Sequence, residues 1–599
     1  MTGKPTWYER WPARFAEERH RLEALGFRLD AALLCSARTV SFCGEIAHAD
    51  RRYGIEVQFP AGFPELPPQV YGPGFLLPRH QDPATRNMCV LGHDDWQPSM
   101  TAGDLVVRAQ ELVATWGAGA LAPRGGEGDG GDDEWAPEPR SASYPYTRET
   151  CILVPPQLLG PPPGTRGTFR AALDLGPSIA GTRGVLLEAA SDAPSRRLEA
   201  GEPWCLMYGG RDAGLRGLWF RAHEPPPPTN DLQLFNDWAA EQGFAGLEAA
   251  ARRRFRPGGW PHGPVLAAVY PDEAGASGQG TEYWLFAAIA ELNGAPRLEL
   301  LRAYPVTVGD RAGRVPFLGR LAGLTVTAVG LGAVGSQVAV ELARCGVGRF
   351  NLVDPDTLEP GNLVRHAGGL SDVGRYKVAA VARRILEHNP LLDPNGIRLY
   401  PVRVGHRQDQ LDAFTDLLPR TDLLVSTTAD GAVDRLVNAL CLEHGVPAVY
   451  AWVSGGAWGG RAFRVIPGET GCYECAGWTE GRRGFEPPLS APRAAPHYDV
   501  GCWSPTFSGA AFDVGVAAQF AARLAVQTLL RPAGASGEAP YPKSPGHQVV
   551  FNLRQRNGAA AFATRFLPLP RDPRCTTCGR GAYGRGAGGP AGPTRPTAR

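Results

Sequence analysis

Short apolar runs alternate with helical patterns through the second half of the chain. Residues 325–329 are β-branched or apolar and stand between glycines, which predicts a buried strand. An apolar-periodic helix follows and ends near Gly346. The order then continues with strand 350–353, helix 376–386, strand 398–404, helix 408–418, strand 422–427, helix 432–444 and strand 448–453. This alternation predicts a doubly wound α/β domain, to which we assign residues 316–578.

The first part of the chain follows a different pattern. Residues 7–25 are amphipathic and predict a helix, after which strands are expected at 32–34, 40–47 and 54–59. Four prolines between residues 59 and 72 then impose an extended, turn-rich path. A last helix is expected at 102–116. We therefore predict an α+β domain over residues 1–118.

Three further segments complete the organisation. Residues 119–143 are polar and glycine-rich, which predicts a flexible linker, and residues 579–599 predict a disordered basic tail. Between them, residues 144–315 hold apolar runs and a helical pattern near 232–251, but no glycine fingerprint, metal spacing or nucleophile context. This middle region reads only as a folded α/β segment.

Composition narrows the class of protein. A chain of 599 residues is too long for one core, and three domains with linkers is the natural expectation. With 61 basic and 60 acidic residues, nothing indicates nucleic acid or an anionic membrane as the main partner. No apolar run reaches membrane-spanning length, so a cytoplasmic protein is expected. Its 12 cysteines should then be reduced, and each is free, catalytic or metal-bound.

A glycine-rich turn follows the first strand of the α/β domain. Gly330, Gly332 and Gly335 form the pattern GxGxxG at the start of a helix, where backbone N–H groups can bind a phosphate. Asp354 follows the next strand, about where an acidic residue takes the ribose hydroxyls of a nucleotide. A glycine turn that only packs a helix on a sheet is the alternative.

The residues downstream favour phosphate chemistry. Asp356, Asn362, Arg365 and Lys377 bring two cations and a second acid close after Asp354. A hydride-transfer enzyme has no need of them, whereas Arg and Lys stabilise the charge that develops at the α-phosphorus of a triphosphate. A further acid after strand 422–427, Asp430, could hold Mg²⁺ on the phosphates.

The order D-x-D-x(5)-N-x-x-R followed by Lys, with an acid after the next strand, resembles the ATP site of the ThiF, MoeB and ubiquitin-activating superfamily. The resemblance covers about 324–578. It implies adenylation of the C-terminal carboxylate of a ubiquitin-like protein. The implied roles are ribose binding by Asp354, phosphate contacts by Asn362, Arg365 and Lys377, and Mg²⁺ coordination by Asp430.

Two cysteine pairs come late in the same domain. Cys472 and Cys475 form one C-x-x-C, and Cys575 and Cys578 form another. Together they supply the four soft thiolates of a closed tetrahedral Zn²⁺ site, and both pairs recur at similar places in ThiF and MoeB. The alternatives are four unrelated reduced cysteines or, less in keeping with the surrounding elements, a redox C-x-x-C.

Cys502 stands between these pairs in a loop with several glycines and prolines, just before a helix expected at 510–530. A thiol near a helix N-terminus has its thiolate favoured by the helix dipole. In activating enzymes a cysteine in this crossover loop takes the adenylated C-terminus as a thioester, and the resemblance implies that role for Cys502. A packing thiol is the alternative.

The N-terminal domain resembles a ubiquitin-conjugating domain. It has a helix, a run of strands, FP-x-x-FP-x-x-PP, then Cys89, and Trp96 with Pro98 seven and nine residues on. The resemblance implies that Cys89 takes an acyl group from another thioester and passes it to an amine. A buried structural cysteine is the alternative. The usual His-Pro-Asn is not intact, because Gln81 and Asp82 follow His80. The asparagine that would stabilise the oxyanion is therefore unassigned, although Asn87 is close in the sequence.

In the superfamily, an active adenylation domain is usually paired with a second copy of its fold. Residues 144–315 are therefore expected to form a degenerate, catalytically silent Rossmann-like adenylation domain. An unrelated substrate-docking domain would give the same signals.

The whole order, conjugating domain first and activating domain last, is similar to the fused enzymes of bacterial anti-phage CBASS operons. It implies a relay that uses ATP, Mg²⁺ and Zn²⁺ to join the free C-terminal tail of a protein, there a cGAS-like nucleotidyltransferase, to an unknown amine, in a chain expected to be a homodimer. The rival functions are a ThiF/MoeB-like sulfur-carrier adenylyltransferase, which needs no Cys89, and a non-catalytic scaffold.

Overall fold

The chain divides into two compact units, residues 1–306 and 307–599, in a computed structural model of the whole sequence. The structure describes residues 5–77, 80–82, 85–91, 95–116, 144–160, 165–175, 182–191, 197–200, 204, 214–255, 264–273, 280–292, 295–315, 317–480, 486–491, 508–531, 543–556 and 558–579. The predicted linker and tail, 119–143 and 579–599 apart from Gly579, lie outside these residues. No helix in the described residues combines the length and apolar character that a membrane span requires.

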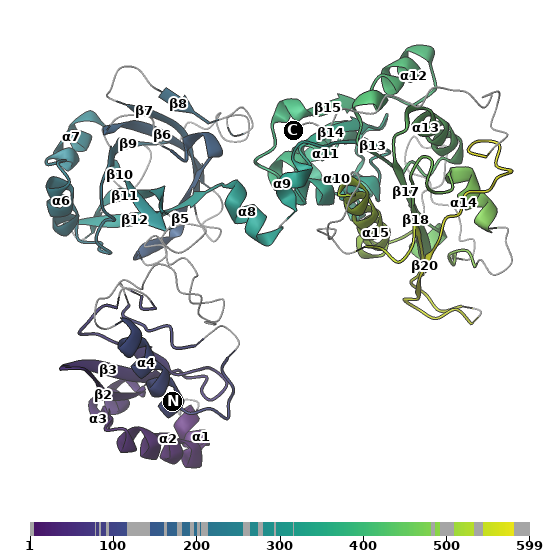
Figure 1. The fold of residues 1–599 in the computed structure, drawn as a ribbon. Coiled ribbons are helices and arrows are strands. Elements are labelled where there is room, and N and C mark those ends of the chain that lie inside the picture. Colours follow the sequence, from purple (N-terminus) through teal and green to yellow (C-terminus); the bar gives the residue numbers. More distant parts are fainter. Residues whose placement is uncertain are drawn as a thin grey trace. The chain divides into compact units, whose positions relative to one another are not determined.

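The N-terminal domain is a four-stranded antiparallel sheet with helices packed against it (Figure 1). Its strands follow the order β1-β2-β3-β4, and its long helices α2 and α4 pack against each other. The elements are α1 (Trp7–Arg10), α2 (Pro12–Ala24), β1 (Arg28–Leu29), α3 (Ala31–Ala37), β2 (Val40–His48), β3 (Arg51–Phe59), β4 (Gln69–Tyr71) and α4 (Ala102–Trp116). Predicted strand 32–34 is wrong, because the Asp30 side chain accepts a hydrogen bond from the Leu33 N–H and begins a helix.

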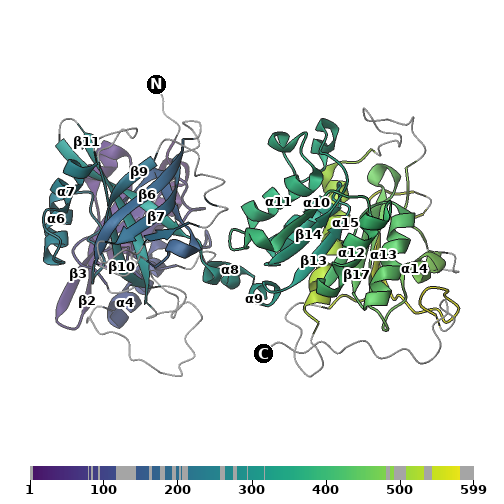
Figure 2. The same ribbon diagram turned by 90° about the horizontal axis from the view of Figure 1, so that it is seen from above.

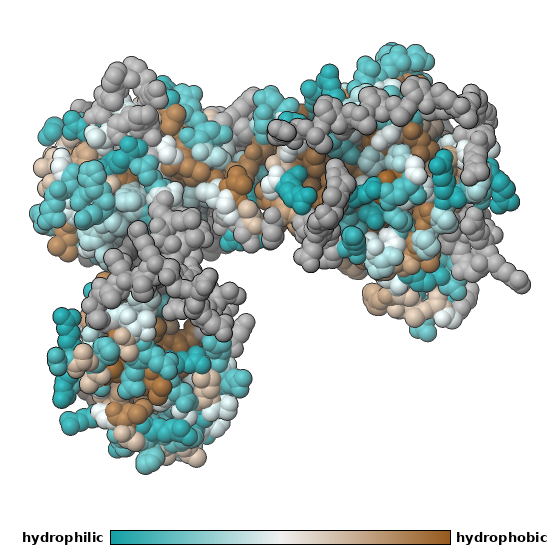
Figure 3. All heavy atoms as spheres, in the orientation of Figure 1, coloured by the Kyte–Doolittle hydropathy of each residue, from teal (hydrophilic) through white to brown (hydrophobic). Residues whose placement is uncertain are grey.

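The proline-rich segment of this domain is held by aromatic rings. Trp7 stacks on Phe59, with ring centroids 5.3 Å apart, and lies 4.6 Å from Phe63. The indole N–H of Trp96 donates to the Pro64 carbonyl over 2.8 Å. These contacts fix the chain on either side of Cys89. On the face of the N-terminal domain drawn in Figure 3, hydrophilic and hydrophobic side chains are mixed.

The middle region does not have the parallel Rossmann-like sheet that was predicted for 144–315. It is an eight-stranded, mostly antiparallel sheet in the order β5-β12-β11-β10-β9-β6-β7-β8, and an additional pairing of β5 with β7 closes it into a barrel. Its strands are β5 (Tyr146–Val154), β6 (Arg166–Leu175), β7 (Thr182–Ser191), β8 (Arg197–Glu199), β9 (Gly214–Arg221), β10 (Val265–Glu273), β11 (Gly280–Leu292) and β12 (Ala295–Pro305). The described part of residues 144–315 therefore contains no second adenylation-type fold.

Alternate side chains of the barrel strands face two different cores. On β10, Val265, Ala267 and Val269 join an inner cluster that also contains Trp219 and Trp284. Their neighbours on the same strand face outward to α6 (Leu232–Glu241) and α7 (Leu247–Arg254), which cover part of the outside (Figure 1). The inside of the barrel is thus filled with apolar side chains.

The second unit begins with α8 (Val308–Arg314) and α9 (Leu318–Leu321), so the division falls before the predicted boundary at 315. The guanidinium of Arg311 donates to the carbonyls of Arg344 and His388 over 3.0 and 2.9 Å. Those carbonyls end two helices that lack further backbone donors there. Arg311 therefore links α8 to the C-terminal ends of both helices.

The second unit contains the predicted doubly wound sheet. Its order is β15-β14-β13-β16-β17-β18-β19-β20, parallel from β15 to β17 and antiparallel beyond. The strands are β13 (Thr325–Val329), β14 (Arg349–Val353), β15 (Ile397–Tyr400), β16 (Leu423–Ser426), β17 (Ala448–Val453), β18 (Gly459–Val465), β19 (Gln548–Asn552) and β20 (Thr564–Leu567). The predicted parallel strands are confirmed to within a few residues at their ends.

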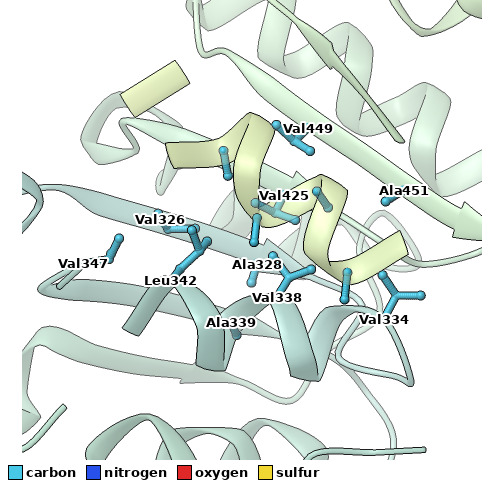
Figure 4. Packing of buried hydrophobic residues seen from close by; sticks show 14 of the residues in the cluster. Val326, Ala328, Val334, Val338, Ala339, Leu342, Val347, Val425, Val449 and Ala451 are labelled. Carbon is cyan, nitrogen blue, oxygen red and sulfur yellow. The ribbon is translucent and has the colours of Figure 1, made fainter. Parts of the chain in front are cut away.

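Helices cover both faces of this sheet (Figure 2). They are α10 (Gly335–Arg344), α11 (Lys377–His388), α12 (Gln408–Thr415), α13 (Gly431–His444), α14 (Tyr473–Glu480) and α15 (Ala511–Leu529). On one face α10, α11 and α15 share a core with the strands, where Val338 and Leu342 meet Val326 and Val425 (Figure 4). On the other face α12, α13 and α14 share a second core that includes the four late cysteines.

Candidate functional site

The glycine-rich turn lies between the carboxyl end of β13 and α10. Gly330 has φ +79°, which a side chain would strain, and a Cβ there would also meet the backbone of Thr428 at 2.8 Å. A Cβ on Gly335 would overlap the Gly330 carbonyl and the Thr427 hydroxyl. A Cβ on Gly332 would meet no described atom within 4 Å. Two glycines thus serve the packing of the turn, and Gly332 leaves an open approach to its backbone.

Asp354 holds this turn in place. It is 5% exposed at the end of β14, and its carboxylate accepts hydrogen bonds from the N–H groups of Leu331 at 2.6 Å and Asp356 at 2.9 Å. Burial raises the pKa of the carboxyl, while Lys377 and the two N–H donors act against that rise. In this structure Asp354 therefore orders the glycine-rich turn, and its contact with a ribose remains a prediction.

The sequence prediction missed His366, which supports the turn from the other side. His366 is 8% exposed, its Nδ1 accepts from the Gly368 N–H at 2.8 Å, and its Nε2 lies 2.9 Å from the Leu331 carbonyl. Because Nδ1 accepts, Nε2 carries the proton and donates. Burial lowers the pKa of His366 to about 4, which keeps the ring neutral. Its place directly after Arg365 was the only signal in the sequence.

The predicted phosphate-contacting residues lie on one loop that leads into α11. Lys377 Nζ pairs with Asp356 Oδ2 at 2.8 Å, and the side chain of Lys377 is 13% exposed. Asn362 Oδ1 accepts from the Glu359 N–H at 3.2 Å in a short 3-10 helix, Pro360–Val364. The carbonyl of Arg365 accepts from Gln337 Nε2 on α10 at 3.1 Å. The loop is therefore tied to the helix that follows the glycine turn.

Asp430 lies at the neighbouring strand end and caps α13. Its Oδ1 accepts from the N–H groups of Ala432 and Val433, and the residue is exposed. Ala429, directly before it, has φ +56°, a strained value for a residue with a side chain. The helix-capping role is a finding, and Mg²⁺ coordination by Asp430 remains a prediction.

The sequence prediction also missed Asp434, a buried acid on α13 one turn after this cap. Its Oδ1 accepts from the hydroxyls of Ser426 at 2.6 Å and Thr428 at 2.9 Å. Burial raises the pKa of Asp434, and the hydroxyl donors oppose that effect. It fixes the chain between β16 and α13, against which the glycine turn packs.

The four late cysteines come together, as predicted. Cys472, Cys475, Cys575 and Cys578 are all buried, and their sulfur atoms lie within 4.8 Å of one another. Three Sγ–Sγ distances are 4.0, 3.6 and 3.5 Å. Zn–S bonds of about 2.3 Å in a tetrahedron place the sulfurs about 3.8 Å apart. Both the donor set and its size therefore fit Zn²⁺, which would neutralise thiolates that burial otherwise disfavours.

Cys89 is exposed on the N-terminal domain, between buried Met88 and Val90. Its N–H donates to the His80 carbonyl at 2.8 Å. The alternative of a buried structural cysteine is thus excluded for this residue. Cys35 and Cys43 are exposed too.

The residues that replace His-Pro-Asn are partly committed to structure. Gln81 is 6% exposed, accepts from the Leu77 N–H at 2.8 Å and donates to the Gly72 carbonyl at 3.0 Å. Its amide is therefore occupied in holding the loop. Asn87 is half-buried and pairs with Tyr71 through its backbone. Cys502 lies outside the described residues, so its role stays a prediction.

The strand order places the turn where β14 and β16 leave β13 in opposite directions, which is where doubly wound sheets bind ligands. The fold and this turn define a doubly wound α/β domain with a glycine-rich turn at the point where the strand order reverses. Residues 311–565 match the ThiF family, and the chain contains a ThiF-family domain.

Relatives include both whole-chain and partial matches. The uncharacterized protein y4oA of Sinorhizobium fredii (strain NBRC 101917 / NGR234) is 26% identical over 566 residues, covering 86% of this chain and 88% of that protein. Ubiquitin-like modifier-activating enzyme 5 of Drosophila willistoni is 31% identical over 25% of this chain and 38% of its own length. The ATP-dependent ubiquitin transferase-like protein Cap2 of Escherichia coli (strain TW11681) is 28% identical over 30% of each. Part of this chain is thus similar to ubiquitin-like modifier-activating enzyme 5 and to Cap2.

Among solved structures, the crystal structure of E. coli MccB with succinimide aligns with 45% of this chain and 74% of its own. The identity is 21% and the TM-score 0.34, values too low to support a functional comparison.

Proposed function

We propose that the ThiF-family domain uses ATP to adenylate the C-terminal carboxylate of a protein. The supporting observation is the turn itself, where Gly332 leaves its backbone approachable beside Asp354, Asp356 and Lys377. A carboxylate oxygen attacks the α-phosphorus, and pyrophosphate leaves. Lys377 and Arg365 stabilise the negative charge on the phosphates, Asn362 contacts them, and Asp354 binds the ribose. Homology to activating enzymes supports the same reaction.

Two cofactor ions belong to this proposal. Asp430 would hold Mg²⁺ for the phosphates, since its exposed carboxylate lies at the strand end next to the glycine turn. The four-cysteine cluster would hold Zn²⁺, because the spacing of its sulfur atoms fits that ion. The zinc would be structural, because four protein ligands leave no open position.

The acyl group then moves through two cysteines. The Cys502 thiolate attacks the acyl carbonyl of the adenylate and AMP leaves. The Cys89 thiolate attacks the acyl carbonyl of this thioester and frees the Cys502 thiol. An amine finally attacks the acyl carbonyl of the Cys89 thioester, forms an amide and frees the Cys89 thiol. The exposed position of Cys89 and the ubiquitin-conjugating-like order of the N-terminal domain support this path. A sulfur-carrier adenylyltransferase would have no use for an exposed Cys89.

The activated protein, in this proposal, carries a free C-terminal tail. The similarity of the whole domain order to fused CBASS enzymes favours a cGAS-like nucleotidyltransferase as that protein and anti-phage defence as the setting. The same family resemblance supports a homodimer in the cytoplasm.

The test uses the full chain with ATP, Mg²⁺ and a candidate tail-bearing protein, and follows thiol-sensitive adducts together with ATP–pyrophosphate exchange. Cys502→Ala should lose both thioesters and keep exchange. Cys89→Ala should keep the Cys502 thioester and lose the second. Cys43→Ala removes another exposed cysteine of the same domain and should change neither.

Adducts that persist in both the Cys502→Ala and Cys89→Ala proteins would refute the cysteine assignments. Exchange without any thioester in the wild type would favour the sulfur-carrier function. Absence of exchange with every tail-bearing protein tried would favour the scaffold.

A further inference from the structure

The four-cysteine cluster is tied directly to α13. Tyr473 follows Cys472, and its backbone N–H donates to Asn438 Oδ1 at 3.0 Å. Asn438 is 1% exposed on α13, one helical turn after Asp434. The Tyr473 hydroxyl lies 3.5 Å from Asp434 Oδ2, at the outer limit for a hydrogen bond. One residue between two cluster cysteines thus contacts both buried polar side chains on one face of α13.

Asp434 carries this connection to the end of β16. Its other carboxylate oxygen binds the hydroxyls of Ser426 and Thr428, at either end of a short connection. Ala429, held at φ +56°, follows Thr428 directly. A strained residue needs surrounding contacts to keep its conformation, and Asp434 holds Thr428, the residue directly before it.

The same connection forms the wall of the glycine turn. The Thr427 hydroxyl donates to the Gly330 carbonyl at 2.6 Å. A Cβ on Gly330 would come within 2.8 Å of the Thr428 backbone, so the two segments pack too closely for a side chain at Gly330. A shift of residues 427–429 would therefore displace the turn that approaches a phosphate.

We propose that Tyr473, Asn438 and Asp434 are positioning residues that couple the four-cysteine cluster to the nucleotide site, so that Zn²⁺ in the cluster and nucleotide at the glycine turn each strengthen the binding of the other. The inference rests on the proposed nucleotide site. A filled cluster fixes the main chain at Tyr473, and through α13 it fixes Thr427 and Thr428 in the arrangement that receives Gly330. Because coupling between two binding equilibria is reciprocal, nucleotide must retain the metal by the same factor by which the metal improves nucleotide binding.

The experiment measures binding of a non-hydrolysable ATP analogue to the full chain, loaded with Zn²⁺ and after chelation. Wild type is expected to bind the analogue about 5- to 150-fold more weakly without metal, the usual range for coupled sites. The analogue should also slow Zn²⁺ release to a chromogenic chelator. This reverse measurement starts from loaded protein and needs no folded metal-free form.

Three variants locate the coupling. Asn438→Leu and Tyr473→Phe each remove one contact between the cluster and α13, and both should bring the affinity ratio toward one while Zn²⁺ still binds. Tyr450→Phe is the matched control. The Tyr450 ring lies 5.1 Å from that of Tyr473, and its buried hydroxyl has no hydrogen-bond partner among the described residues. It should keep the wild-type ratio.

Equal analogue affinity with and without Zn²⁺ in wild type, or an unchanged ratio in both Asn438→Leu and Tyr473→Phe, would overturn the coupling. If the affinity ratio also falls toward one in Tyr450→Phe, general packing around Tyr473 would explain the coupling. That result would overturn the specific roles of Tyr473, Asn438 and Asp434. Binding alone is measured, so a chain that couples metal to nucleotide but adenylates no carboxylate would refute only the proposed function.

Discussion

Two sheets of eight strands each lie in this chain, and they differ in the direction of their strands. In the ThiF-family domain five neighbouring strands are parallel, so their carboxyl ends meet at one edge and bring Gly330, Asp354 and Asp430 together from three separate loops. In the barrel most neighbours are antiparallel and the sheet closes on itself around apolar side chains. The parallel sheet brings polar loop residues together at one edge, whereas the alternating apolar residues of the barrel strands pack in its interior.

The largest expected effect tests whether the barrel is only a core. Trp284 is 3% exposed, stacks on Phe286 and donates to the Leu158 carbonyl at 3.0 Å. Trp284→Ala should destabilise the barrel by about 3–5 kcal/mol, the usual loss for a buried tryptophan. Denaturant unfolding would measure the loss, and nucleotide binding should stay unchanged. Leu234→Ala, at a 54% exposed position, is the control. Weaker nucleotide binding in Trp284→Ala would contradict the separation of the two sheets.

Substitutions of the glycines in the turn should have different effects, because Gly335 is closely packed and Gly332 is not. Gly335→Ala places a Cβ against the Gly330 carbonyl and should destabilise the ThiF-family domain by about 1–3 kcal/mol. Gly332→Ala meets no described atom, so stability should hold while nucleotide affinity falls. Thermal unfolding and nucleotide titration of both proteins separate the two roles. Equal stability losses would show that the turn is only a packing device.

The smallest expected effect is a pH dependence that the barrel should not share. The folded-state pKa of His366 is about 4, below its ordinary 6.5, so the unfolded chain binds more protons between these values. Stability is therefore present above pH 6.5 and lost as pH falls toward 4, by at most about 3 kcal/mol. His366→Gln keeps a donor for Leu331 and should flatten this dependence in unfolding measured from pH 4.5 to 7. An unchanged slope would contradict a buried neutral imidazole.

Local patterns predicted the parallel sheet well because each of its strands and helices carries its own periodicity. They failed for the barrel because an apolar run such as 265–270 reads as a buried strand without naming its partners. β10 pairs with β11 along its whole length and in parallel with β9, across a long connection, and only the three-dimensional structure shows that. Asp30, which caps α3, also outweighed the apolar pattern that predicted strand 32–34.

Motif residues were easier to predict than the residues that hold them. The spacing of the acids and cations placed Asp354, Asp356 and Lys377 close together, and the cysteine pairs met as expected. His366 and Asp434 act through side-chain hydrogen bonds, to Leu331 and to Ser426 and Thr428, that no motif spacing in the sequence marks. Cys502 lies outside the described residues, so its assignment is still a prediction.

The meeting of Cys472 with Cys575, 103 positions apart, has a topological consequence. A metal held by both pairs closes that stretch into a ring, as a disulfide would, and a loop of about 100 residues cross-linked in this way restricts the unfolded chain by several kcal/mol. Residues 486–491, α15 and β19 all lie inside the ring. A single proteolytic nick within it would leave two fragments still joined through the ion, and chelation would remove that bond.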